Sequence, residues 1–273
     1  MQNFRATPVE MVASLWHNRN LILQMSRREV IGRYRGSVMG LAWSFFNPLL
    51  MLSVYTFVFS VVFKMRWGGA PDDSRFGFAI LLFVGMIVHG LFAECANRAP
   101  GLILGNANYV KKVVFPLEIL PAIGLGSALF HAGISLVVLL AAQLLVAGSL
   151  VWTVLLFPLV LLPLIFTTIG FAWLFAGLGV YLRDMGQIVG VFTTALMFVS
   201  PVFFPASALP EQFQILMQLN PLTYIIEEGR NTLIFGNVPD AGAWLRNLFA
   251  GFVIAWLGFA WFQKVRKGFA DVL

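Results

Sequence analysis

The sequence predicts an all-α membrane protein with six transmembrane helices, an amphipathic interface helix at the N-terminus, and re-entrant helices between the fifth and sixth spans on the external side. Of the 273 residues, 59% are hydrophobic and 11% are charged, whereas an ordinary globular chain is about a quarter charged. The apolar residues gather in long runs, and residues 119–182 contain no Asp, Glu, Lys or Arg. Since about 20 apolar residues cross a bilayer, that run holds two crossings. We expect one domain over residues 1–273.

Residues 1–30 are expected to form a cytoplasmic interface helix rather than a cleaved signal peptide, because polar residues interrupt the segment where a signal peptide needs an apolar core. Thr7 suits the helix cap, Pro8 the first helical position, and Glu10 completes a capping-box pattern. As far as about Met25, the apolar residues fall on one broad face, which is typical of a helix lying in the membrane interface. The alternative is a helix packed against a soluble partner.

Uncharged segments define the six spans, with the longest run divided near Gly148. The expected spans are residues 36–63, 76–96, 119–147, 151–181, 185–204 and 244–263. An even number of crossings places both termini on one side of the membrane. Thirteen of the 18 Lys and Arg residues lie on that side, so the positive-inside rule makes both termini cytoplasmic. The sequence therefore predicts a multi-pass protein of the cytoplasmic (inner) membrane.

Two connections are long enough to hold folded structure, and function is expected to concentrate there. Residues 97–118 form a basic cytoplasmic loop in which a short helix is expected between Asn108 and Val114. Residues 205–243 form an external, acidic connection that contains short apolar segments beside prolines. Such segments predict re-entrant or interfacial helices, which are tolerated where protein buries them or where they line a cavity.

The sequence offers little catalytic or nucleotide-binding chemistry. It contains neither a phosphate-binding loop nor a G-x-G-x-x-G motif, so any energy from ATP would have to enter through another polypeptide. The single cysteine, Cys95, excludes an internal disulfide, and the three scattered histidines do not suggest a metal site. We expect no catalytic residue, no bound metal and no nucleic acid partner.

Three ionisable residues lie in or beside the spans. His89 and His131 are expected to form hydrogen bonds between helices, and Glu94 is expected at the membrane interface. A proton-coupled carrier normally needs an acid in the middle of a span, and the sequence has none. This argues against a secondary transporter.

Several segments, in order along the chain, resemble the permease subunits of polysaccharide-export ABC transporters. The first span opens with Arg33-Tyr34-Arg35-Gly36-Ser37 and continues to Asn47-Pro48-Leu49, like the first membrane helix of that family. Residues 106–121 resemble its coupling segment, and the C-terminal residues 269–273 resemble the tail of O-antigen exporters. Further matches are Val180-Tyr181-Leu182-Arg183-Asp184 between spans four and five, Ser200-Pro201-Val202, and Leu219-Asn220-Pro221 with Arg230.

The resemblance implies a permease that forms a homodimer and binds two copies of a cytoplasmic ATP-binding subunit. ATP and Mg²⁺ would be held by that subunit, and no cofactor by this chain. The implied cargo is a lipid-linked polysaccharide; O-antigen is favoured, capsule polysaccharide and teichoic acid are alternatives, and a small-drug exporter is more distant. The implied path lies between the protomers, where aromatic faces let sugar rings slide. Its candidate residues are Trp43, Phe46, Tyr55, Phe59, Phe198 and Phe203.

Two further sets of residues follow from this resemblance. The candidates for coupling to the ATPase are Asn108, Tyr109, Lys111, Lys112, Arg183 and Asp184. The lysines could instead bind anionic lipid, and the Arg-Asp pair could cap the fifth span. The candidates for binding the lipid pyrophosphate where substrate enters are Arg27, Arg28, Arg33 and Arg35, because arginine binds phosphate oxygens bidentately. The positive-inside rule explains these arginines equally well.

Two other classes of function are weighed against a permease. An intramembrane glycosyl- or acyltransferase acting on a lipid carrier would need clustered acids or histidines at an interface. The adjacent acids Glu227-Glu228 and Asp72-Asp73 have no histidine near them in sequence. A non-transporting assembly protein is the third class, and it predicts no dependence on any ATPase.

Overall fold

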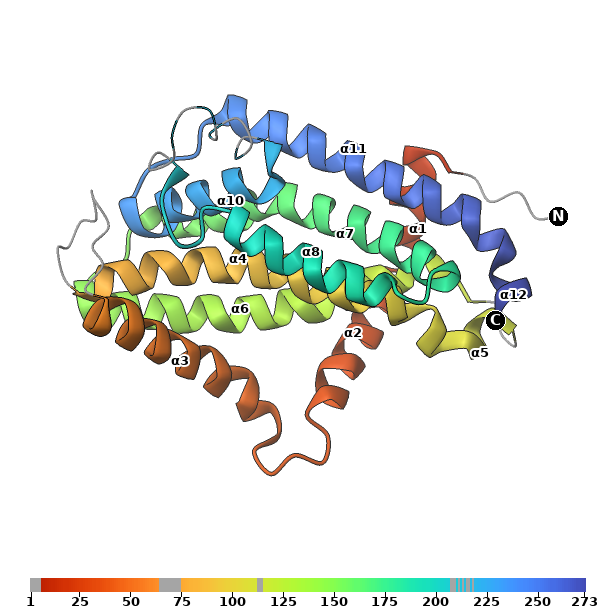
Figure 1. The fold of residues 1–273 in the computed structure, drawn as a ribbon, viewed down its shortest axis with the longest axis horizontal. Helices are drawn as coiled ribbons and strands as arrows, with labels where there is room; N and C mark the ends of the chain where they lie inside the picture. Colours follow the sequence, from red (N-terminus) through yellow and green to blue (C-terminus); the bar gives the residue numbers. More distant parts are fainter. Residues whose placement is uncertain are drawn as a thin grey trace.

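The computed structural model describes residues 6–63, 75–111, 115–206, 210, 212, 214, 217 and 219–273, and across them the regular structure is entirely helical (Figure 1). This confirms the all-α class. The N-terminal half contains α1 (Pro8–His17), α2 (Arg19–Arg33), η1 (Gly40–Ala42), α3 (Trp43–Tyr55), η2 (Thr56–Val62), α4 (Arg75–Leu102), η3 (Leu104–Asn106) and α5 (Ala107–Lys111). The remainder contains η4 (Leu117–Ile119), α6 (Leu120–Ala147), η5 (Trp152–Leu156), α7 (Phe157–Tyr181), α8 (Met185–Val199), α10 (Pro221–Arg230), η7 (Asn231–Phe235), α11 (Ala241–Val265), η8 (Arg266–Gly268) and α12 (Phe269–Val272).

Five helical stretches among the described residues are long and apolar enough to cross a membrane. They are Gly40–Phe59, Gly77–Leu102, Leu117–Ala147, Trp152–Tyr181 and Ala241–Val272. The expected fifth span, residues 185–204, corresponds to α8, which has 15 residues and ends at Val199. At 1.5 Å per residue α8 rises about 22 Å, less than the ~30 Å hydrocarbon core. The second expected span continues as helix beyond residue 96, to Leu102.

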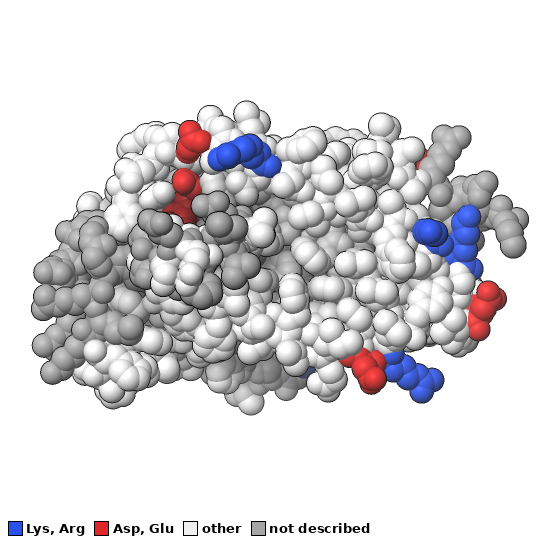
Figure 2. Space-filling view, turned by 45° about the horizontal axis from the view of Figure 1, so that its top comes forward, with Lys and Arg blue, Asp and Glu red and all other residues white. Residues whose placement is uncertain are grey.

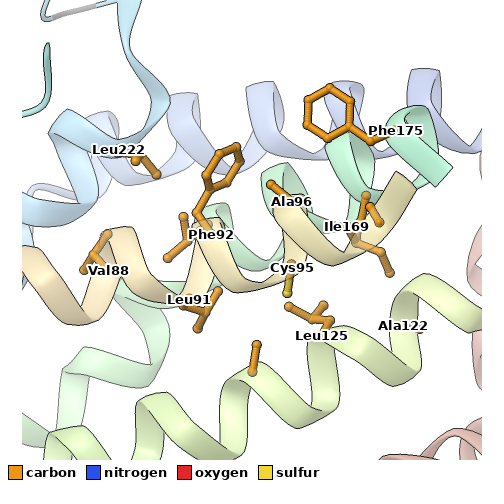
Figure 3. Close-up of a cluster of buried hydrophobic side chains, with 14 of the residues drawn as sticks. Val88, Leu91, Phe92, Cys95, Ala96, Ala122, Leu125, Ile169, Phe175 and Leu222 are labelled. Carbon is orange, nitrogen blue, oxygen red and sulfur yellow. The ribbon is translucent and has the colours of Figure 1, made fainter. Parts of the chain in front are cut away.

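The long helices pack in an order that makes α4 the centre of the molecule. The helix α11 packs on α7, α7 on α4, and α4 on α6, while α3 lies against α6 and α4. In the most apolar stretch of α4, 78% of the residues are buried, compared with 11% in the first span. Figure 3 shows Phe92 and Cys95 of α4 in the buried cluster with Leu125 of α6 and Ile169 of α7. The first span is therefore peripheral in the single chain.

Glycines allow close helix packing between α7 and α11. A Cβ atom added to Gly258 would collide with the backbone of Gly170, including its carbonyl oxygen, and one added to Gly170 would lie 2.5 Å from the carbonyl oxygen of Ile254. Small residues at such positions let backbones approach, which is how helices associate in lipid without a hydrophobic driving force between them. Pro100 of α4 makes a similar close approach to Gly179 of α7.

The N-terminal segment forms two helices rather than one. Thr7 caps α1 as expected, because its hydroxyl accepts a 3.2 Å hydrogen bond from the Glu10 backbone N–H. The expected continuous helix to Met25 is interrupted at Asn18, whose backbone (φ −93°, ψ 10°) is not helical and whose side chain donates to the Ser14 carbonyl at 2.8 Å. The second helix, α2, then runs to Arg33.

The helices α1, α5 and α12 lie toward one end of the elongated molecule (Figure 1). On the face shown in Figure 2, charged side chains lie in a few places near the edges of the view, and an uncharged surface separates them. Such a surface is what a chain embedded in hydrocarbon requires, since charge there is costly.

We predict that Gly258→Ala lowers the thermal unfolding midpoint of the detergent-purified protein, with a loss of about 1–3 kcal/mol, because the new methyl group must displace backbone. The matched control is Gly124→Ala in α6, where an added Cβ meets no heavy atom within 4 Å. Alanine is favoured over glycine in helices by about 1 kcal/mol, so the control should unfold at the same temperature or higher. Equal midpoints for the two variants would contradict the close packing of α7 on α11.

Candidate functional site

A cavity of about 840 Å³ lies between the α2–α3 pair and helices α4 and α6. In Figure 1, α2 and α3 form a V that projects from the helical bundle. The wall that α4 contributes extends from Phe83 to Arg98, about 22 Å along the helix axis. One end of this wall is apolar, with Phe83, Met86 and Ile87, and the other end carries Glu94 and Arg98. The cavity is therefore amphipathic and elongated.

A network of charged side chains from α2, α4 and α6 forms the polar end of the cavity. Arg33 donates to the Glu94 carboxylate at 2.6 Å and lies 2.9 Å from Nδ1 of His131. Arg98 pairs with Glu29 at 2.5 Å and lies 3.8 Å from Glu94. Because Glu94 is 18% exposed and His131 is 15% exposed, the network is partly shielded from solvent. Each charge there has an opposite charge beside it.

The two histidines near the spans make the expected hydrogen bonds between helices. Nε2 of His89 in α4 lies 2.9 Å from the Thr193 carbonyl of α8, and His131 in α6 contacts α2 through Arg33. The phenol of Tyr34 lies 3.2 Å from Nε2 of His131. Burial raises the pKa of Tyr34, and the positive charge of Arg33 partly opposes that rise, so this phenol stays protonated at neutral pH.

The four arginines predicted to bind lipid pyrophosphate are placed differently from one another. Arg33 lines the cavity, whereas Arg27, Arg28 and Arg35 are exposed residues outside its lining. The cavity also contains Arg98, which the sequence analysis did not select. Arg98 lies in the segment expected to be loop, and its place on α4 became clear only because the helix continues to Leu102.

The six candidate path residues separate into three groups. Phe59, Phe198 and Phe203 form a contiguous aromatic cluster, with ring centroids 6.0 Å apart for Phe59–Phe203 and 5.6 Å apart for the stacked Phe198–Phe203 pair. Tyr55 lines the cavity. Trp43 and Phe46 lie on the exposed surface of α3, 42% and 40% accessible. The structure thus joins the first span to the end of α8 through aromatic rings.

The proposed coupling residues that the structure describes lie toward the end of the molecule that holds α12. The helix α5 packs against α12, and Tyr109 stacks on Phe115 with centroids 4.4 Å apart. Asn108 is exposed on α5. The side chain of Lys111, and the whole of Lys112, lie outside the described residues.

The turn between α7 and α8 lies toward the same end of the molecule (Figure 1). Arg183 and Asp184 are exposed there. Asp184 precedes α8 as its N-cap residue, but its side chain makes no capping hydrogen bond. The backbone carbonyl of Asp184 instead accepts hydrogen bonds from the N–H groups of Gln187 and Ile188.

Two segments quoted for the family resemblance meet in space although they are far apart in sequence. The Asn220 side chain donates to the Ser200 hydroxyl at 2.8 Å. The buried Arg230 donates to the carbonyl of Val202 at 2.9 Å and to the carbonyl of Leu81 in α4 at 3.0 Å. These contacts fix α10 against α4 and against the chain that follows α8.

Glu118 is a buried acid to which the sequence analysis gave no role. Its carboxylate accepts hydrogen bonds from Ser14 at 3.0 Å and from Arg266 at 2.6 Å, and its backbone carbonyl accepts one from the Trp173 indole at 2.8 Å. The signal that could have found it is its position: one carboxylate directly before a 64-residue run without charge, residues 119–182.

These features define a multi-pass membrane protein with an amphipathic cavity between its helices. The chain belongs to the ABC-2 type transporter family, whose sequence profile matches residues 20–234. It is 27% identical over 265 residues to the O-antigen export system permease protein RfbA of Myxococcus xanthus, covering 96% of this chain and 99% of that protein.

Two further relatives cover most of the chain. The protein of the same name from Klebsiella pneumoniae is 27% identical over 258 residues, covering 93% of this chain and 95% of that protein. The polysialic acid transport protein KpsM of Escherichia coli is 23% identical over 216 residues, covering 78% of this chain and 81% of that protein. Membership of the family implies an ATP-binding partner subunit.

We predict that Glu94→Ala destabilises the protein by about 1–3 kcal/mol, because it leaves the charges of Arg33 and Arg98 with less compensation. Arg33→Gln alone should cost about 1 kcal/mol or less, since solvent screens this half-exposed side chain. The free energy of unfolding of the two single variants and the double variant forms a double-mutant cycle with the wild type. The stability losses of the two single variants should sum to more than the loss in the double variant. Arg35→Gln, an exposed change nearby, is the control; strict additivity of the Arg33 and Glu94 changes would contradict the network.

Proposed function

We propose that this chain is the transmembrane subunit of an ATP-driven exporter that moves a lipid-linked polysaccharide across the cytoplasmic membrane, with O-antigen as the favoured cargo. The observation that carries the proposal is the match along almost the whole of both chains to permeases of O-antigen export. Capsule polysaccharide is the alternative cargo favoured by the polysialic acid transport relative. The chain itself would perform no catalysis, and ATP and Mg²⁺ would be bound by the partner.

The proposed topology has six crossings with both termini cytoplasmic. Its short fifth crossing would consist of α8 together with the residues that follow, to about residue 204. The position of α1 and α12 toward one end supports an even number of crossings (Figure 1), and the excess of Lys and Arg on that side supports the orientation. α10 has 10 residues and is too short to cross, yet it packs on α4 and α7. A re-entrant position for α10 is consistent with those contacts.

The proposed interface helix is α1 with the start of α2. Met11 is fully buried in the protein, whereas Val9, Val12 and Trp16 are 78%, 51% and 68% exposed. Apolar side chains that the protein leaves uncovered are accommodated where a helix lies along the membrane surface. This arrangement would hold α2, and so the arginine-rich approach to the cavity, at the level of the lipid headgroups.

The proposed assembly is a homodimer bound to two ATP-binding subunits. The exposure of the first span supports the proposal of a homodimer, because only 11% of its most apolar stretch is buried in one chain. The rings of Phe57 and Phe198, each 60% exposed, would then face lipid or the partner. The sequence has no phosphate-binding loop, so a separate ATPase must supply the energy.

The proposed path begins in the amphipathic cavity. Arg33 and Arg98 would bind the lipid pyrophosphate, since guanidinium groups bind phosphate oxygens bidentately. The aromatic cluster of Phe59, Phe198 and Phe203 would carry sugar rings farther across the membrane. The ring faces offer contact without fixed hydrogen bonds, which suits a polymer that must slide.

The direct test of the cargo is export in proteoliposomes that contain the chain and its cognate ATPase. Lipid-linked O-antigen, capsule polysaccharide and teichoic acid are supplied in turn, and the measurement is the ATP-dependent appearance of glycan that a membrane-impermeant glycosidase can digest. Export of O-antigen above the others is expected. Export of another of these glycans in preference would reassign the cargo, and no export of any glycan would contradict the proposal.

We predict that Lys111→Glu combined with Lys112→Glu leaves the protein folded but lowers export at least about tenfold. Reversed charges would repel the acidic groups proposed on the ATPase. The measurement is glycan export alongside ATP hydrolysis in the reconstituted complex. Lys264→Glu, an exposed change near the end of α11, is the charge-reversal control. Export at the wild-type level in the double variant would remove the coupling assignment and favour lipid binding by these lysines.

We predict that Phe198→Ala lowers glycan export about threefold or more without changing the thermal midpoint. An aromatic contact contributes about 0.5–1.5 kcal/mol, which corresponds to that order of change in rate. Phe57→Ala is a matched control, because both rings are 60% exposed but Phe57 lies outside the aromatic cluster. Equal export by the two variants would exclude Phe198 from the path.

A further inference from the structure

Glu118 lies near the C-terminal end of the proposed coupling segment, just before the first turn of α6, and it contacts three other parts of the chain. The carboxylate joins α1 through Ser14 and the end of α11 through Arg266. The carbonyl of the same residue joins α7 through Trp173. Since Glu118 itself belongs to η4, which leads directly into α6, one residue ties four helices together at one end of the molecule.

Arg266 also connects Glu118 to an earlier part of the coupling segment. The second terminal nitrogen of Arg266 donates to the Phe115 carbonyl at 3.4 Å, and Phe115 stacks on Tyr109 of α5 with centroids 4.4 Å apart and an interplanar angle of 15°. The helix α5 is therefore connected to Arg266 through a stacked ring and a hydrogen bond. The 2.6 Å ion pair connects Arg266 in turn to Glu118.

The burial of these groups makes the connection stiff. The side chains of Arg266 and Glu118 are 13% and 12% exposed, so little water is available to replace the ion pair. Charge-assisted hydrogen bonds are shorter and stronger than neutral ones, and a buried carboxylate that lost its partners would be strongly unfavourable. The four helices should therefore move together with the coupling segment rather than independently of it.

We infer that Glu118 is a positioning residue that transmits the displacement of the coupling segment to α1, α7 and α11 at once. The inference rests on the proposed function, because it takes α5 to be the element that the ATPase moves. Glu118 touches neither nucleotide nor the cavity in this account. It acts through Arg266, Ser14 and Trp173, and its expected effect is on how much glycan is exported for each ATP hydrolysed.

The test is Glu118→Gln in proteoliposomes with the cognate ATPase, with glycan export and ATP hydrolysis measured in the same sample. The amide keeps the shape of the carboxyl group but removes its charge. ATP hydrolysis is expected to stay within about twofold of wild type, while glycan exported per ATP falls at least about tenfold. Glu118→Asp, which retains the charge, should recover part of that ratio.

Milder variants keep the test decisive if Glu118→Gln does not assemble. Ser14→Ala removes one contact of the carboxylate, and Arg266→Lys retains the charge but loses the forked geometry; each should lower the ratio about two- to threefold. Ser53→Ala is the matched serine control, because the Ser53 hydroxyl donates only within its own helix, to the Leu49 carbonyl at 2.9 Å.

Three results would overturn the inference while the proposed function stands. They are an unchanged ratio of export to hydrolysis in Glu118→Gln, an unchanged ratio in both milder variants, or a parallel loss of export, hydrolysis and thermal stability with no change in the ratio. Failure of the proposed function would be seen in the wild-type complex instead, which would then show no ATP-dependent export.

Discussion

The hydrocarbon core of a bilayer excludes charge, and the arrangement of these helices follows from that exclusion. Uncompensated charges and unpaired backbone groups are costly there, so the chain crosses as long uncharged helices and holds its charged groups toward the ends. Helices in lipid gain little from apolar burial against one another and rely on close contact instead. The glycines between α7 and α11 allow that close contact. The helix α4 is buried because other helices pack on several of its sides.

The same constraint favours the pairing of charged side chains that lie among the helices. Arg33 is paired with Glu94, and Arg266 is paired with Glu118. The first pair lines the amphipathic cavity and the second connects the coupling segment to the bundle. Under the proposed function, binding of a charged substrate and transmission of movement from an ATPase would depend on separate ion pairs that lie on different helices.

Much of the fold follows from the sequence, because runs without charge mark membrane helices directly. The cap at Thr7 was predictable from local chemistry, and Gly148, where the longest run was divided, adopts φ 72° and ends α6. The end of α8 at Val199 was not predictable, since it is fixed by the contact of Arg230 with the chain that follows α8. The continuation of α4 to Leu102 was not predictable either, since it is fixed by packing on α7. The long-range partners of Arg98 and Glu118 were likewise not predictable, because Glu29, Ser14 and Arg266 lie far from them in sequence. The helical phase that separates Tyr55 from Trp43 and Phe46 also required the three-dimensional structure.

Coupling between this chain and its ATPase can be measured as ATP hydrolysis by the cognate ATPase in lipid nanodiscs, with and without this chain and with and without lipid-linked polysaccharide. We expect the polysaccharide to stimulate hydrolysis only when this chain is present. Stimulation of the ATPase without the chain, or no complex and no response with it, would show that this chain is not the coupled permease.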